Sequence, residues 1–370
     1  MRSKNLRHVR APPLCHLDVV PFGYKHQPLC PSGTGWFSFV ARSPVKYDKP
    51  HLTLTQQVEK LVNRGLAIPD QERTARFLET IGYYRVSAYA YPFRELLDDE
   101  APRGSSVQFR SNSFIPGAQF TWVEDMWRFD RDLRLLVMDA IEIVEIALRS
   151  KVGYHLGLRH TLGHLDAVNL DSTRANQPDN EEPGRSMFDV WLERYLGHQD
   201  RAAESEDFIK HYVEKYDGNL PVWVATETME LGPLVRLYGF MTDSDRSQVA
   251  GELGQISGAV FVRWMKVANY LRNASAHHAR LWNRSLTYKI GRIPDNVPSL
   301  LHLNDHANRK IRVYGICATL AHLTSVIRPD DRWRARFVEL MDSFPTGPPV
   351  APETHMGFPA RWRELDVWNR

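Results

Sequence analysis

An arginine and a histidine five residues apart, Arg272 and His277, are the residues of this sequence best suited to chemistry on a phosphate. They begin and end the string Arg-Asn-Ala-Ser-Ala-His. Arginine stays protonated and offers a planar fork of donors that fits phosphate oxygens, whereas histidine has an unperturbed pKa near neutrality. Together these residue types suit the metal-independent transfer of an RNA phosphodiester to its own 2′-hydroxyl, a reaction in which protons must be removed and supplied.

Two neighbours of the pair bear on how it would act. Asn273 and His277 are four residues apart and share one face of a helix, whereas Arg272 points about 100° away and must swing its long side chain toward them. His278 is a rival for the histidine role, because spacing alone does not exclude it. The shared face with Asn273 favours His277 as the catalytic histidine.

The string lies in a stretch that contains no acidic residue, between Glu252 and Asp295, although the chain as a whole has 47 Lys and Arg against 44 Asp and Glu. Positive charge binds RNA phosphates, and aromatic rings can stack on unpaired bases. A solvated basic helix with its aromatic residues in the core is the alternative. The residues expected to bind RNA are Arg263, Lys266, Arg280 and Arg284, and the aromatic residues among them are Trp264, Tyr270, Trp282 and Tyr288.

A second group of charged residues, Glu142, Glu145 and Arg149, is spaced three and four apart and therefore shares one helix face. We expect this group to support the site as a buried polar ladder, with an ordinary surface ion pair as the alternative. Paired carboxylates also occur in metal nucleases, but no D-x-D or H-x-E partner accompanies these two. No metal and no other cofactor is therefore expected.

Composition and cysteine usage indicate a folded cytoplasmic protein. The 370 residues are 43% hydrophobic and carry a net charge of +3, which is ordinary for a globular chain. Cys15, Cys30 and Cys317 are widely spread and lack CxxC spacing, so neither disulfides nor a zinc site is expected. The longest apolar stretch, 133–148, is interrupted by three acidic residues, and the N-terminus has prolines where a signal peptide needs an apolar run, so no membrane association is expected.

Helical periodicity dominates the sequence from Tyr47 onward and predicts an all-α fold. Thr53 followed by Gln56 predicts one helix start, Asp70 predicts the next, and the longest helix is expected to begin near Phe120. Further helical patterns cover 187–216, 221–241, 257–282 and 306–327, whereas 166–186 and 101–118 are predicted loops, the second with the option of a β-hairpin. We divide the chain into an extension expected to be disordered (1–45), a helical region with a loop (46–118), a helical domain (119–328) and a C-terminal tail (329–370).

Five blocks in order resemble the Abi-like family of abortive-infection proteins, which act in bacterial defence against phage. The resemblance covers roughly residues 47–327 and so leaves out the extension and the tail. The blocks are YDKPHLTLTQQVEKLVNRGLAI, FLETIGYYRVSAYAYPFRE, FDRDLRLLVMDAIEIVEIALRSKV, LPVWVATETMELGPLVRLYGFM and LRNASAHHARLWNR.

The resemblance implies a helical bundle of the HEPN type, in which the R-x-x-x-x-H residues are Arg272 and His277 and the polar neighbour is Asn273. It also implies an endoribonuclease that pairs two such motifs across a homodimer, and some relatives are associated with a small noncoding RNA. Two other classes of function stay open: a module that binds a regulatory RNA without cleaving it, and a protein-binding scaffold. The presence of a histidine together with the arginine favours catalysis over binding alone, because histidine is a residue type suited to proton transfer.

Overall fold

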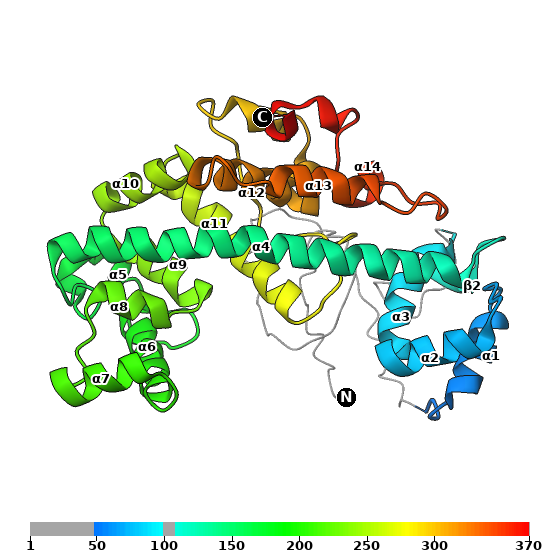
Figure 1. Cartoon of the computed structure of the whole chain (residues 1–370), viewed down its shortest axis with the longest axis horizontal. Coiled ribbons are helices and arrows are strands. Elements are labelled where there is room, and N and C mark those ends of the chain that lie inside the picture. Colours follow the sequence, from blue (N-terminus) through cyan, green and yellow to red (C-terminus); the bar gives the residue numbers. More distant parts are fainter. Residues whose placement is uncertain (1–47, 99–107, 370) are drawn as a thin grey trace, which may run out of the picture. The chain divides into compact units, whose positions relative to one another are not determined.

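The computed structural model describes residues 48–98 and 108–369, which divide into two units, one ending at Glu124 and one beginning at Asp125 (Figure 1). The extension expected at 1–45, with two of the three cysteines, lies outside the described residues. Among the described residues one small two-stranded sheet accompanies the helices, so the chain is all-α, as predicted.

Capping side chains set the start of the first two helices of the N-terminal unit. Thr53 accepts a hydrogen bond from the Gln56 backbone N–H at 3.3 Å, and the Gln56 side chain accepts one from the Thr53 N–H at 2.9 Å. Asp70 caps the second helix through the Arg73 N–H at 2.8 Å. Both predicted helix starts are therefore confirmed. The helices are α1 (Leu54–Val62), α2 (Gln71–Ile81), α3 (Tyr83–Ala90) and the 3-10 helix η1 (Tyr91–Phe93).

The β-hairpin that was an option at 101–118 is confirmed in part, because its second strand lies in that range and its first strand lies before it. Strand β1 (Arg94–Leu96) pairs antiparallel with β2 (Arg110–Phe114), and the register is irregular between its two paired positions. Strand β2 has the polar sequence RSNSF, in which only Phe114 is buried. Sequence periodicity could not fix the strand because one buried residue in five gives no alternation.

The long helix α4 (Phe120–Arg159) is the element around which the second unit is built. On one side of it, the Trp333 Nε1–H donates to the Leu136 carbonyl at 2.7 Å. On the other side, the Arg149 guanidinium donates to two carbonyls of the segment 226–229. Figure 1 shows these two sides of α4 as the α12–α13 layer and the α8–α9 layer. The elements of this unit after α4 are η2 (Ala167–Asn169), α5 (Ser172–Ala175), α6 (Met187–Ala203), α7 (Asp207–Tyr216), α8 (Val222–Ala225), η3 (Thr226–Thr228), α9 (Leu231–Phe240), α10 (Asp243–Gly254), α11 (Gly258–Ala276), η4 (Pro298–Asn304), η5 (Ala307–Ile311), α12 (Val313–Ile327), α13 (Trp333–Asp342), α14 (Pro352–Met356), η6 (Trp362–Glu364) and α15 (Asp366–Asn369).

Three segments differ from the sequence-based expectation. The helix α10 was not expected, because its sequence DSDRSQVAGELG has no clear apolar face; its signal was Thr242, whose hydroxyl accepts from the Asp245 N–H at 3.4 Å. The loop expected at 166–186 contains η2 and α5. The tail expected at 329–370 is folded, since its described residues form helices whose aromatic side chains stack in the core of the second unit.

Those aromatic side chains explain why the C-terminal segment is folded. Trp333 and Phe337 are fully buried, and the Phe337 and Trp368 rings stack at a centroid distance of 4.7 Å. Burial of one such side chain stabilises a fold by a few kcal/mol. Sequence reasoning set this segment apart because prolines interrupt its periodicity, whereas the burial depends on contacts with α4 and α12 that are distant in sequence.

Candidate active site

The string from Arg272 to His277 forms the C-terminal turn of α11, which ends in a Schellman motif. The His277 N–H donates to the Asn273 carbonyl at 3.0 Å, so helical geometry continues to His277. The Ala279 N–H donates to the Ala274 carbonyl at 2.8 Å, which closes the motif. His277 and His278 are both exposed at this helix end.

The rival histidine, His278, occupies the left-handed position of the Schellman motif, with a φ of 56°. Glycine is the usual residue there, because a Cβ makes the left-handed conformation costly. Its backbone N–H donates to the Ser275 carbonyl at 2.9 Å. His278 is thus a strained cap residue, whereas His277 keeps ordinary backbone angles, φ −85° and ψ 12°.

The Arg272 side chain swings toward its polar neighbour, as its length allows. Its Nη1 donates to the Asn273 Oδ1 at 3.2 Å and lies 3.7 Å from Glu230 Oε2, at the start of α9. The Arg272 side chain is 27% exposed. The Arg272 guanidinium is therefore hydrogen-bonded to the Asn273 carboxamide and remains accessible to solvent. A phosphate that binds Arg272 would have to displace the Glu230 carboxylate.

Arg272 also lines an open groove of about 450 Å³ together with the predicted supporting group Glu142, Glu145 and Arg149 of α4. The wall is part apolar, and two of its apolar residues, Leu135 and Ile146, are 56% and 46% exposed. The structure therefore brings the supporting group to Arg272. Asn273 and His277 do not line this groove, because they lie on another face of α11.

Within the supporting group, Arg149 is the best-connected side chain. It donates to Glu145 at 2.6 Å, to the Thr226 carbonyl at 3.2 Å and to the Met229 carbonyl at 2.8 Å. The side chains of the Glu145–Arg149 pair are only 12% and 17% exposed, so the pair is more than a surface contact. Arg149 fixes the segment that leads into Glu230, whereas Glu142 is exposed.

One positioning residue was missed by sequence reasoning. The Asp130 carboxylate, fully buried in α4, accepts the backbone N–H groups of Leu281 at 2.9 Å and Trp282 at 2.6 Å and pairs with Arg134. It thereby anchors the turn that follows His277. The signal in the sequence was an aspartate at a position where the helical period of Leu133 and Val137 demands an apolar residue.

The stretch without acidic residues, between Glu252 and Asp295, lies partly in the hydrophobic core. Trp264 and Trp282 are fully buried, so they cannot stack on RNA bases, and that expectation is corrected for these two. Burial follows from their place on the inward faces of α11 and of the turn that Asp130 anchors. Tyr270 is half-buried and Tyr288 is 42% exposed, so both stay accessible.

The four expected RNA-binding residues fall into two classes. Arg284 donates to the Tyr270 hydroxyl at 2.7 Å and to the Arg280 carbonyl at 2.8 Å, which commits its guanidinium to the turn. Arg280 is half-buried beside it. Arg263 and Lys266 are exposed on α11. Of the four residues, Arg263 and Lys266 are therefore the two whose side chains are exposed to solvent.

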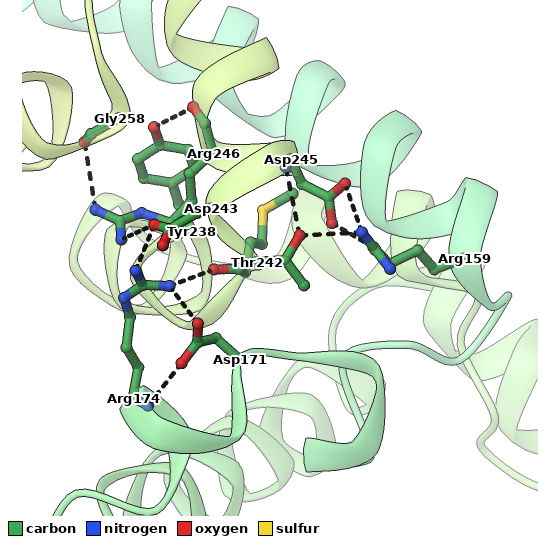
Figure 2. A network of polar contacts seen from close by, with 10 residues as sticks. Arg159, Asp171, Arg174, Tyr238, Thr242, Asp243, Asp245, Arg246 and Gly258 are labelled. Carbon is green, nitrogen blue, oxygen red and sulfur yellow. Dashed lines mark hydrogen bonds and ion pairs between the residues drawn. The ribbon is translucent and has the colours of Figure 1, made fainter.

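A polar network at the N-terminal end of α11, opposite the candidate site, holds α10 and α11 in place (Figure 2). Arg246 of α10 donates to the Gly258 carbonyl at 3.4 Å and pairs with Asp243, which also pairs with Arg174. The Tyr238 hydroxyl donates to the Arg246 carbonyl at 2.7 Å, and burial raises the pKa of that phenol above its usual range. The network fixes the first turn of α11 and therefore the direction in which the helix carries the candidate site.

Metal-binding clusters and membrane-spanning helices are both absent from the part of the chain that the structure describes. No three His, Cys, Asp or Glu side chains gather there as a metal site requires. No helix in the described ranges is both long and apolar enough to cross a bilayer.

Comparison with known proteins identifies a family. Residues 76–283 match the family described as Abi-like protein, a span that covers more than half of the chain and ends just beyond the turn after His277. No curated protein and no solved structure shows significant similarity. The matched region includes part of α2, all of α3 to α11, and the proposed catalytic and supporting residues, whereas Arg284 lies just beyond its end. The chain therefore belongs to the Abi-like protein family, and with it to the proteins of abortive infection and phage defence.

Proposed function

We propose that this Abi-like chain is a metal-independent endoribonuclease of the HEPN type, with Arg272, Asn273 and His277 as its catalytic residues. The observation that carries the proposal is the accessible end of α11, where the Arg272 guanidinium meets Asn273 at 3.2 Å one helical turn before the exposed His277. This end of α11 lies inside the region matched by the family.

The reaction divides between a phosphate clamp and a proton carrier. Arg272 binds the non-bridging oxygens of the scissile phosphate, and its charge offsets the negative charge that grows in the transition state. The 2′-hydroxyl oxygen bonds to phosphorus while the bond to the 5′-oxygen breaks. A base takes the 2′-hydroxyl proton and an acid protonates the 5′-oxygen. The products are a 2′,3′-cyclic phosphate and a 5′-hydroxyl.

One chain supplies His277 for one of these proton transfers, so a homodimer is the proposed active unit. A two-fold axis doubles any motif that lies near it, which brings a second His277 to the composite site. The exposed Leu135 and Ile146 beside Arg272 support such an interface, because apolar side chains that line a groove gain by being covered.

The second candidate function is a non-catalytic module that holds a regulatory noncoding RNA. Glu230 favours this alternative, because its carboxylate lies 3.7 Å from the Arg272 guanidinium and competes there with the scissile phosphate that cleavage requires. Binding without cleavage does not require a phosphate at Arg272. The two candidates differ in whether the RNA is cut.

A cleavage assay on purified RNA, with and without EDTA, distinguishes these functions. We expect the wild-type protein to cut in EDTA and to leave a cyclic phosphate or 3′-phosphate. The Arg272→Ala and His277→Ala variants should lose activity at least about 100-fold, as loss of a proton-transfer group or a charge clamp usually does, while His278→Gly should retain it. Binding without cleavage would favour the noncoding-RNA module, and activity restored only by magnesium would refute the mechanism.

The dimer has its own test. An Arg272→Ala chain and a His277→Ala chain, each with a different tag, are co-expressed and purified through both tags to isolate the heterodimer. Light scattering then gives its mass, and the cleavage assay compares it with each homodimer. Wild-type protein that cuts RNA while it remains a monomer, with and without substrate, would contradict the composite site.

A further inference from the structure

The outward face of α11 carries a row of polar and charged side chains that leads away from the candidate catalytic pair. Lys266, Tyr270, Asn273 and His277 follow one another at spacings of four, three and four, which places them on one helix face. Tyr270 is half-buried and the other three are exposed. At about 1.5 Å per residue, Lys266 lies roughly 16 Å along the helix axis from His277.

The neighbouring helix α9 runs antiparallel to α11 and adds a second cation at the far end of this row. A Cβ on Gly232 would lie 3.3 Å from the Asn269 side chain, so the two helices are in close contact there. One turn further along α9, Arg236 lies within electrostatic range of Lys266. Arg236 is exposed, so both cations reach solvent from adjacent helices.

Within the described ranges, these two cations are not in ion-pair contact with a carboxylate. Arg236 and Lys266 make no ion pair there, although Asp179 lies within electrostatic range of Arg236 and accepts two backbone N–H groups of its own turn. The pKa of Lys266 is lowered, first by its partial burial and then by the positive charges of Arg236 and Arg246. An anion bound between the two cations would relieve this repulsion.

We propose that Arg236 and Lys266 form a second phosphate-binding subsite, so that the RNA strand cut at Arg272 and His277 runs along α11 and is held at both ends of the row. RNA is named as the occupant on the basis of the proposed ribonuclease function. A stacked strand rises about 3.4 Å per nucleotide, so roughly 16 Å corresponds to about five nucleotides. A single row of polar and charged side chains on one helix face follows one strand, so the substrate class is RNA with an unpaired segment of about this length.

The salt dependence of binding tests the subsite. Full-length His277→Ala protein is the parent, so that RNA stays intact, and fluorescence anisotropy follows labelled single-stranded RNAs of about 4 and about 12 nucleotides, below and above the span of about five. Adding Arg236→Gln and Lys266→Gln should weaken binding of the longer RNA. It should also reduce the slope of log K against log salt by about 1.4, which is about 0.7 for each RNA phosphate that is no longer neutralised.

Matched variants show whether the missing positive charge is the cause. Binding of the short RNA should not change, and exchanging the two cations, Arg236→Lys with Lys266→Arg, should restore the slope. Arg332→Gln, which removes an exposed arginine of the α13 cap, should leave it unchanged. The subsite is wrong if the double glutamine variant keeps the parental slope on the longer RNA, or if a fully paired duplex shows the same reduction.

Cleavage by otherwise wild-type protein separates this inference from the proposed function. If wild-type protein binds RNA without cutting it and the double variant shows the reduced slope, the subsite stands and the ribonuclease proposal fails. If wild-type protein cuts RNA and the double variant cuts the longer RNA equally well at every salt concentration, the ribonuclease proposal stands and the subsite fails. Wild-type protein that binds no RNA would overturn both.

Discussion

At the scale of single residues, the candidate site depends on how the turn after α11 is held. The motif residues stand at a helix end, where the last carbonyl groups repel a phosphate. Arg272 compensates for this repulsion with its full positive charge. The Schellman motif and the Asp130 carboxylate fix the backbone on the C-terminal side of His277.

His278 provides the first prediction, because its φ of 56° favours glycine. The His278→Gly variant should be more stable than His278→Ala by about 1 kcal/mol, since only the alanine variant keeps a Cβ in the left-handed conformation. Urea unfolding of the two variants measures the difference. Equal stability would mean that the motif is not formed in solution.

Asp130 provides the second prediction. Asp130→Ala should lower the free energy of unfolding by about 3–5 kcal/mol, because it removes the carboxylate that pairs with the nearly buried Arg134 side chain and accepts two backbone N–H groups. Glu72→Ala, which removes an exposed carboxylate that is paired with Arg76, should change it by less than about 1 kcal/mol. Denaturant unfolding measures both, and similar losses would contradict the anchoring role of Asp130.

At the scale of elements, α4 receives its neighbours through small residues and through polar contacts. Gly153 and Gly157, one turn apart, leave room for Trp223 of α8. On the next turn back, Arg149 donates to the carbonyls of η3 and of the residue after it. These contacts fix α8, η3 and the start of α9, and thereby set the position of Glu230 beside Arg272.

A pair of glycine substitutions tests this packing. A Cβ at Gly153 would lie 2.9 Å from the Trp223 Cα, so Gly153→Ala should destabilise the protein by about 1–3 kcal/mol, because backbone must move. A Cβ at Gly197 of α6 would meet nothing closer than 3.8 Å, so Gly197→Ala should stabilise its helix by about 0.5–1 kcal/mol. Thermal unfolding compares the two, and shifts in the same direction would contradict the close packing of α8 against α4.

At the scale of the whole molecule, buried histidines make stability depend on pH. His164, in the turn after α4, is fully buried, and neither ring nitrogen has a hydrogen-bond partner among the described residues. Burial lowers its pKa to about 4. His302 behaves likewise, with a pKa lowered to about 4 by burial and by the Arg309 charge.

The direction of the pH effect follows from proton binding. The unfolded chain protonates these rings near pH 6.5, whereas the folded chain does so only near pH 4. The contribution of each neutral histidine to the free energy of unfolding is therefore fully present above pH 6.5. It is lost as the pH falls toward 4, by at most about 1.4 kcal/mol per pH unit for each histidine.

The His164→Phe variant tests this expectation. Between pH 7 and pH 5, the free energy of unfolding should fall less in this variant than in wild type, by on the order of 2 kcal/mol. Urea unfolding at the two pH values gives both numbers, and the comparison across pH cancels any change in packing. An unchanged fall would assign the pH dependence to other groups.

Local sequence signals determined much of the secondary structure. The Thr53–Gln56 capping box, the Asp70 cap and the periodicity from Phe120 depend on residues within a few positions of one another, so each predicted its helix. The helical pattern expected over 257–282 likewise predicted α11, although the helix ends six residues earlier, at Ala276. The Abi-like family was also evident from the ordered blocks, and the match over 76–283 confirms it.

Only the tertiary structure decided which side chains face solvent and which distant residues meet. Asp130 and Trp282 are 152 residues apart, and Arg149 and Met229 are 80 apart, so no local pattern could predict either contact. Trp264 is in the core and Lys266 is exposed although they are neighbours on one helix, because the described elements pack on the face of α11 that carries Trp264 and not on the face that carries Lys266. The fold of the C-terminal segment likewise depends on aromatic stacking between residues that lie far apart along an irregular stretch of chain.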